Sequence, residues 1–242
     1  VIKALNKGKA IYVEKPLALD IQSITDIEES IYRSEKPKLF IGFNRRFSKS
    51  TQFVKQKLIN SPANSINLRF SVPPLNSDHW TNIKEIGGGR IVGEAVHGID
   101  LACYLFDSLP QSISASAPVD KSNNVVKDNQ VFLSINFANG SHASIQYFSE
   151  ANQILSKERI EVHGEGNSYI LEDFRMLRFL EGSQDRSKTF SSGKGHKESL
   201  SVFFDYVRDK TQNPFTWEEI KAVSKAAIIA QNHINSGQQH RV

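Results

Sequence analysis

The sequence predicts an α+β protein in which a large, mainly antiparallel open sheet carries helices on one face and follows a remnant β-α-β unit of parallel sheet. Two observations support this prediction. Residues 10–42 hold two short apolar runs with a helical stripe between them, as parallel strands and their crossover helix do. From Ile66 onward, apolar residues alternate with polar ones, which is typical of antiparallel strands that face solvent on one side.

The parallel unit begins with Ala10–Val13, a continuous apolar run typical of a strand that is buried on both faces. Asp20 is a suitable N-cap for the next helix, whose buried stripe is expected to be Ile21, Ile24, Ile27 and Ile31. Leu39–Gly42, after Pro37, is the second strand. Parallel strands joined by one crossover end at the same edge of their sheet, and α/β sheets bind ligands at that edge.

The antiparallel part is predicted from period-two alternation, with helices that interrupt and close the strand series. Asn139-Gly140 is a strong hairpin signal, and Thr216 with Glu219 has the spacing of a capping box that opens the final helix. Strands are expected at 66–72, 113–119, 131–137, 143–147, 159–162, 169–171 and 177–180, helices at 49–60, 91–106 and 197–209 (with Phe203, Phe204 and Val207 inward), and a loose stretch at 182–195. The uncovered face of such a sheet predicts a homo-oligomer, a dimer or a tetramer.

Composition excludes several classes of protein. With 39% hydrophobic and 23% charged residues, the 242-residue chain resembles ordinary globular proteins, and no apolar run approaches the roughly 20 residues that span a bilayer. The net charge of +4 is dispersed along the chain, which argues against a nucleic-acid groove. Cys103 is the single cysteine, so we expect a reducing cytoplasm. Because the chain opens on Val1, we expect an excised, processed or partial product of a longer protein.

Lys15 stands at the ligand edge of the predicted parallel unit, in the sequence Val-Glu-Lys-Pro. The proline restricts Lys15 to extended geometry, and the bond between them is a candidate for the cis form. A lysine held there can stabilise developing alkoxide charge on a substrate oxygen, or move protons if burial lowers its pKa. The alternative is a surface lysine that ends a strand. Asn44, Arg45 and Arg46 follow the second strand and either contact a cofactor or substrate, or only cap the sheet.

His97 lies on a predicted helix that follows the flexible run Gly87-Gly88-Gly89. Glu94 and Asp100 are each three residues from His97, within side-chain reach on a helix. The two carboxylates are expected to orient the imidazole and to raise its pKa toward neutrality, as a general acid or base requires. The alternative is a hydrogen-bonded histidine in an ordinary helix start. The remaining histidines show no metal-binding spacing, and Cys103 sits in an apolar helix, more typical of core than of a nucleophile.

Together these motifs resemble the glucose–fructose oxidoreductase / inositol dehydrogenase / MocA (Gfo/Idh/MocA) family of NAD(P)-dependent oxidoreductases. The resemblance covers nearly the whole chain and rests on the order of Glu14-Lys15-Pro16, Gly42 to Phe47, the glycine run, His97 with Asp100, and the final helix. It implies that residues 1–45 are the end of a dinucleotide-binding Rossmann domain and that residues 46–242 are a substrate-binding and oligomerisation domain. The family often carries an aspartate four residues before the histidine; here that position is Gly93, and Glu94 follows about 100° further around the helix.

The resemblance also implies roles for individual residues. Lys15 is the family lysine beside nicotinamide and substrate, and His97 is the active-site histidine. The implied sets are catalytic Lys15, His97 and Glu94; cofactor-binding Glu14, Lys15, Pro16, Asn44 and Arg45; and substrate-binding Lys15, Arg46, Asp100 and His97.

We therefore expect part of an oxidoreductase that passes hydride between NAD or NADP and a secondary alcohol or ketone of a sugar, cyclitol or related polyol. The adenosine half of the cofactor site is not among these residues, and this chain alone is expected to be inactive. The expected partners are a small sugar-like molecule and other copies of the chain, with no metal, nucleic acid or membrane. The rival interpretation is a non-catalytic relative that serves as a binding and oligomerisation module.

Overall fold

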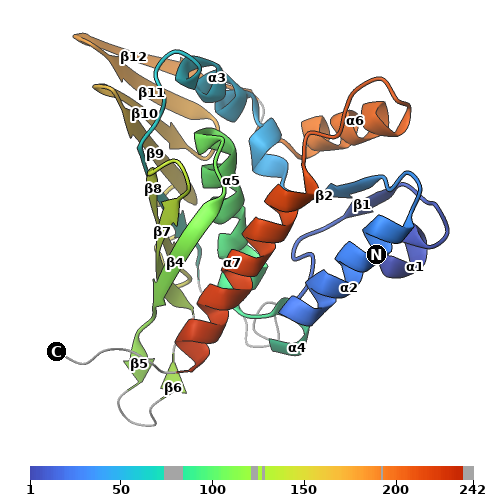
Figure 1. The fold of residues 1–242 in the computed structure, drawn as a ribbon. Helices are drawn as coiled ribbons and strands as arrows, with labels where there is room; N and C mark the ends of the chain where they lie inside the picture. The colour runs from blue at the N-terminus through green and yellow to red at the C-terminus, as the bar shows by residue number, and fades with distance from the viewer. Residues whose placement is uncertain (74–83, 121–124, 127–128, 192, 237–242) are drawn as a thin grey trace.

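The computed structural model describes residues 1–73, 84–120, 125–126, 129–191 and 193–236, and two sheets dominate it (Figure 1). The small sheet pairs β1 (Ile11–Val13) with β2 (Leu39–Ile41) in parallel. The large sheet has eight strands in the order β12-β11-β10-β9-β3-β8-β7-β4, antiparallel except for β3 beside β8. This confirms the predicted α+β class.

The strands of the large sheet are β3 (Ser65–Ser71), β4 (Pro110–Ser116), β7 (Gln130–Phe137), β8 (His142–Phe148), β9 (Glu158–Gly164), β10 (Asn167–Glu172), β11 (Met176–Glu181) and β12 (Gln184–Thr189), while β5 (Val119–Asp120) pairs with β6 (Val125–Val126). The helical segments are α1 (Ile2–Leu5), α2 (Ile21–Arg33), the 3-10 turn η1 (Asn44–Phe47), α3 (Lys49–Leu58), α4 (Lys84–Gly87), the π-helical turn η3 (Ile91–Ala95), α5 (Val96–Phe106), α6 (His196–Val207) and α7 (Trp217–Asn235).

The parallel unit forms as predicted. The Asp20 side chain accepts a hydrogen bond from the Ser23 amide and caps α2, which buries Ile24 and Ile27. Ile21, also expected in the buried stripe, is exposed in the first turn of the helix, and Ile31 is half-buried. Another detail is wrong: β1 is not buried on both faces, since only Ile11 is buried and Tyr12 and Val13 are half-buried. The β1–β2 pair nevertheless joins the rest of the molecule, because one continuous cluster of buried apolar residues includes both sheets.

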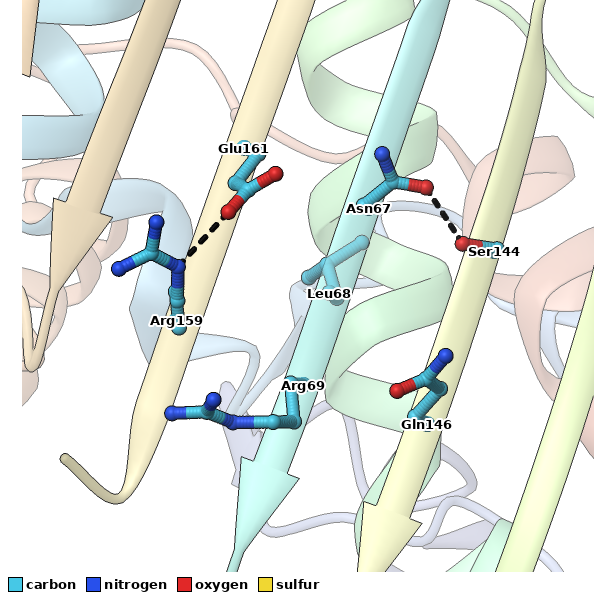
Figure 2. A pocket seen from close by; sticks show the side chains of 7 residues that line it. All are labelled: Asn67, Leu68, Arg69, Ser144, Gln146, Arg159 and Glu161. Atoms are coloured by element: carbon cyan, nitrogen blue, oxygen red, sulfur yellow. Dashed lines mark hydrogen bonds and ion pairs between the residues drawn. The ribbon is translucent and has the colours of Figure 1, made fainter. Parts of the chain in front are cut away.

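The large sheet is covered on one face by α3, α5 and α7 (Figure 1). Ile66, Leu68 and Phe70 point into this covered face and are buried. Many side chains on the opposite face are polar: Ser144 donates to Asn67 over 2.6 Å, and Arg159 donates to Glu161 over 2.7 Å (Figure 2). Phe132 and Phe148 also lie on this face and pack edge-on against each other. In the inner strands, such as β7 and β9, alternate residues therefore face the helices and the uncovered surface.

Two other sequence predictions are wrong. Part of the stretch expected to be loose forms β12, whose side chains are all exposed, so that hydrophobic periodicity gives no signal for it.

On α6, Phe204 was expected to point inward but is 53% exposed. Its neighbour Phe203 takes the inward position and packs edge-on against Tyr12 and Phe40. A helix presents only one of two adjacent residues to a single contact face.

Candidate active site

The carboxyl ends of β1 and β2 bring the first candidate residues together. Lys15 follows β1 by two residues, and the amide of Gly42 donates to the carbonyl of Val13, so that the two chain segments leave the sheet side by side. The Lys15–Pro16 peptide bond is cis. Glu14 is exposed, and its carboxylate lies directly against Gly42, where a Cβ would meet Oε2 at 2.6 Å. The predicted ligand edge is therefore formed from backbone and from Glu14 and Lys15.

Lys15 is held by the helical segment that leads to His97. Its ammonium donates to the backbone carbonyl of Gly93 and to Glu94 Oε1, the latter over 3.0 Å. The lysine side chain is 12% exposed and the glutamate 26%, so the pair is partly shielded from water but still reachable. Lys15 and Glu94, predicted from separate motifs, thus form one ion pair.

Glu94, and not a residue at position 93, supplies the carboxylate that binds Lys15. A Cβ at Gly93 would lie 2.9 Å from the carbonyl oxygen of Gly87, so a side chain at 93 requires the backbone to shift. The longer side chain of Glu94, on the π-helical turn η3, reaches Lys15 instead. Such single π turns are frequent at functional sites.

His97 is 4% exposed, and its Nδ1 is buried without a hydrogen-bond partner among the residues described. Burial lowers its pKa well below 6.5, and the positive charges of Arg45 and Lys15 lower it further. The expectation that Glu94 and Asp100 raise this pKa is wrong, because Glu94 pairs with Lys15 and Asp100 with another cation. His97 is consequently a neutral imidazole at neutral pH, with one unprotonated ring nitrogen.

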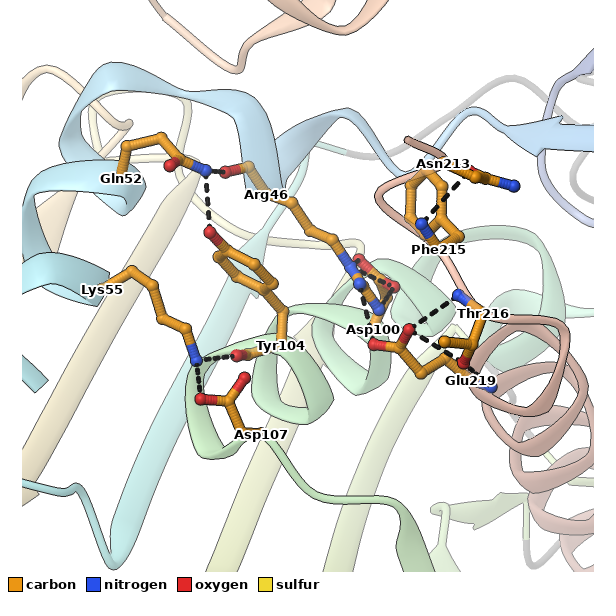
Figure 3. A network of polar contacts seen from close by, with 10 residues as sticks. All are labelled: Arg46, Gln52, Lys55, Asp100, Tyr104, Asp107, Asn213, Phe215, Thr216 and Glu219. Carbon is orange, nitrogen blue, oxygen red and sulfur yellow. Dashed lines mark hydrogen bonds and ion pairs between the residues drawn. The ribbon is translucent and has the colours of Figure 1, made fainter. Parts of the chain in front are cut away.

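Arg46 and Asp100 form that other, closed network (Figure 3). Arg46 Nε donates to both Asp100 carboxylate oxygens, over 2.8 and 3.0 Å, and Nη1 donates to Glu219 over 3.1 Å. Its guanidinium lies 4.7 Å from the ring centre of Phe215. Arg46 is 2% and Asp100 1% exposed, so the structure accounts for both without a substrate, and we place them outside the site.

Asp100 differs from an ordinary carboxyl in its ionisation. Burial raises its pKa to about 6, and Arg46 opposes that shift. Burial alone would lower the pKa of Arg46, but the adjacent Asp100 and Glu219 carboxylates raise it overall. The arginine therefore stays charged.

Asn44 and Arg45 meet a part of the chain that sequence reasoning did not select. Arg45 donates to both oxygens of Glu158, over 2.9 and 2.8 Å, and Asn44 Nδ2 donates to the Lys194 carbonyl over 2.7 Å. Lys194 also forms an ion pair with Glu158. The sequence does indicate that Glu158 is buried, because it stands in the same inward register as Ile160 and Val162 in β9. Lys194 lies in a polar stretch without periodicity, and the sequence gives no sign of it.

The glycine run packs against α7 at Gly89. Gly88 and Gly89 have φ of 71° and 92°, a conformation that favours glycine. A Cβ at Gly89 would lie 2.4 Å from the Gln231 side chain, whose Oε1 accepts from the Ile91 amide over 3.0 Å. The run thus permits close packing of the η3 turn on α7.

The resulting site contains a lysine ammonium, its paired glutamate and a neutral buried histidine. An ammonium can donate to a substrate oxygen and stabilise negative charge on it, and a neutral imidazole can take up a hydroxyl proton. Among the described residues there is no group of three or more His, Cys, Asp or Glu placed to hold a metal ion. Nor does any helix in the described ranges have the length and apolar character to cross a membrane.

A family model described as the GFO/IDH/MocA C-terminal domain matches residues 63–170. The chain is 29% identical to inositol 2-dehydrogenase of Rhizobium meliloti over 69% of this chain and 51% of that protein, and 22% identical to myo-inositol 2-dehydrogenase of Thermotoga maritima over 84% and 59%. The chain spans between half and three-fifths of the length of these two relatives.

A solved structure, aldose-aldose oxidoreductase from Caulobacter crescentus, has the same fold. The TM-score is 0.81 at 15% identity, and the match covers 100% of this chain and 74% of that one.

Proposed function

We propose that the chain is the catalytic and oligomerisation portion of an NAD(P)-dependent dehydrogenase of the Gfo/Idh/MocA family, whose C-terminal domain model matches residues 63–170. Its substrate is a sugar, cyclitol or related polyol, oxidised or reduced at a secondary carbinol carbon. The names of the relatives, two inositol dehydrogenases, support this substrate class. In this proposal, residues 1–45 are the end of a Rossmann domain and residues 46–242 are a second, substrate-binding and oligomerisation domain.

The observation that carries the proposal is the juxtaposition of Lys15, paired with Glu94, and the neutral buried His97, whose Nδ1 has no partner in the described structure. These residues fit the nicotinamide end of a dinucleotide, which would lie beside Glu14, Lys15 and Pro16 at the carboxyl edge of the parallel strands. When bound, a nicotinamide cofactor supplies the hydride acceptor or donor.

The chain's own residues handle the oxygen and its proton. Lys15 donates to the substrate oxygen and stabilises the charge that develops there, while Glu94 orients the ammonium. His97, kept neutral by burial and neighbouring cations, accepts the hydroxyl proton in the oxidation direction and returns it in reduction. Asn44 and Arg45 contribute indirectly, since their polar groups bind Lys194 and Glu158.

We further propose that the uncovered face of the large sheet mediates homo-oligomerisation. Asn67, Arg69 and Gln146 line a hollow on this face (Figure 2), which also carries the exposed Phe132. Polar side chains are common in interfaces between subunits that also fold separately. Sedimentation of wild type and of an Arg69→Glu/Gln146→Glu variant tests it: a monomeric variant with unchanged folding supports the interface.

The test of function uses the protein purified from its native source, with its intact mass measured first. We expect NAD or NADP to bind in a fluorescence titration, and inositols or aldoses to yield reduced nicotinamide in a turnover assay. Lys15→Ala should abolish most of this turnover while cofactor binding persists. Absence of nicotinamide binding would contradict the proposal and favour the non-catalytic binding module.

A further inference from the structure

Glu158 joins two cations that come from distant parts of the chain. Arg45 in η1 donates to both of its oxygens, and Lys194, which precedes α6, pairs with its Oε1. The glutamate side chain is 2% exposed and that of Arg45 8%, whereas that of Lys194 is 25% exposed. Of the three charged groups, only Lys194 presents a substantial part of its surface to a ligand.

The backbone at Lys194 is fixed independently of its ammonium. Its carbonyl accepts from Asn44 Nδ2 over 2.7 Å. The next residue, Gly195, has φ of 83°, and a Cβ there would lie 2.5 Å from both the Asn44 carbonyl oxygen and the Ser48 amide. The segment before α6 therefore sits directly on η1, at the end of β2, and the position of Lys194 does not depend on a bound molecule.

Two of the cations that act on His97, Arg45 and Lys194, share a single carboxylate, that of Glu158. Lys15 is paired with Glu94, and Arg45 with Glu158. Lys194 has to share the carboxylate that Arg45 already occupies with two hydrogen bonds. Lys194 also lies close enough to His97 for its charge to contribute to the lowered pKa of that imidazole. One positive charge next to the proposed reaction site thus lacks a carboxylate of its own.

We propose that Lys194 binds an anionic substituent of the substrate, a carboxylate or a phosphate, so that the polyol this enzyme acts on is acidic and not neutral. An anion at this position completes the pairing of two cations with two anions at Glu158 and is partly shielded from water, where such pairs are stronger than at a fully exposed site. The inference rests on the proposed function, since it names the substrate class of that same site.

The experiment compares D-glucose, D-glucuronate and a D-glucose monophosphate on the full-length protein, by calorimetric binding and by nicotinamide-dependent turnover. The variants are Lys194→Gln and, as a matched control, Lys197→Gln, an exposed lysine three positions along on α6. We expect the wild type to bind one anionic sugar at least tenfold more tightly than glucose. Lys194→Gln should raise the Kd and KM for that sugar about tenfold with little change in kcat, and Lys197→Gln should change neither. The glucuronate and phosphate arms distinguish the two anions.

Equal binding of all three sugars, binding of none, or an equal effect of the two substitutions overturns the proposal. If the wild type turns over glucose with no preference for an anionic sugar, and Lys194→Gln leaves that turnover unchanged, the anion-binding proposal is overturned while the proposed function stands. Binding of an anionic sugar that depends on Lys194, without any turnover, supports the binding site and contradicts the proposed redox function.

Discussion

Two clusters of charged residues lie on the same helical segment and differ in how completely their polar groups are paired. In the cluster around Arg46, the guanidinium bonds to Asp100 and Glu219 and is 2% exposed. Three residues before Asp100, His97 is almost as buried, yet its Nδ1 has no partner in the described structure, and nearby Lys15 and Lys194 keep partly exposed ammonium groups.

The difference separates a structural role from a chemical one. Buried polar groups usually have all their hydrogen bonds, and an exception calls for an explanation such as catalysis. The Arg46 cluster satisfies this rule and has nothing left to offer a ligand. The His97 cluster violates it at one atom, beside cations that a substrate can reach. Breaking each cluster should therefore affect different measurements.

The largest effect is expected from Arg46→Met, which removes the cation of the closed cluster. Asp100 and Glu219 then lose their shared partner, and an uncompensated buried charge costs about 3–5 kcal/mol of unfolding free energy. Urea denaturation of the variant and of wild type measures this loss of unfolding free energy. Asp100→Asn is the matched control: it keeps the Glu219 contact and an acceptor for Arg46, and should cost less. Equal stability of Arg46→Met and wild type would contradict a structural role for the cluster.

Lys15→Ala tests the other cluster and should act on turnover. Loss of a positioned proton-transfer or oxyanion-stabilising group lowers kcat by roughly two orders of magnitude or more. Because the Lys15 pair with Glu94 is partly exposed, we expect only a small change in the urea midpoint. Lys15→Arg keeps the charge and serves as control. Unchanged turnover in Lys15→Ala would contradict the role assigned to Lys15.

Much of the fold could be predicted from the sequence, because the elements that form it have periodic apolar faces. The strands from Ile66 onward and the capping box at Thr216 follow local rules that the structure obeys. β12 could not be predicted this way, since its side chains are all exposed and it is held by backbone pairing with β11. Phe204 shows the same limit, because adjacent apolar residues on a helix do not reveal which one is inward.

The candidate site could be predicted only in part. Lys15, Glu94 and His97 could be selected as candidates because they stand beside strand ends and helix starts. The actual pairing of Glu94 and Asp100 could not be predicted, because helical spacing allows both to reach His97 but cannot show that Lys15 and Arg46 bind them instead. Lys194 is brought to the site by contacts with Asn44, 150 positions away in sequence, and no local pattern encodes such a contact.

The pH dependence of stability distinguishes the two clusters, because folding lowers the pKa of His97 and raises the pKa of Asp100. The pKa of His97 is lowered in the folded state, so below 6.5 the unfolded chain binds a proton that the native state does not. Stability is therefore lost as pH falls below 6.5, by up to about 1.4 kcal/mol per pH unit. Asp100, whose pKa is raised to about 6, contributes the opposite slope below that pH.

His97→Leu isolates the histidine contribution. Subtracting the unfolding free energy of this variant from that of wild type, at pH values between 5 and 7 that bracket the ordinary histidine pKa, removes the Asp100 contribution common to both. We expect the difference to fall as pH decreases. A difference that is constant over this range would mean that His97 titrates normally in the folded protein. The same lowered pKa predicts that the acid limb of kcat/KM lies below 6.5.

The smallest effect is expected at an exposed counterpart of Arg46. Arg178 on β11 donates to both oxygens of Asp185 on β12, over 2.9 and 2.6 Å, a geometry as good as that of the buried pair. Its side chain is 54% exposed, so water and salt screen the attraction. Arg178→Ala should leave the urea midpoint indistinguishable from wild type at physiological salt. A loss comparable to that of Arg46→Met would show that bidentate geometry, and not burial, sets the strength of these pairs, and would remove the distinction between the closed cluster and the site.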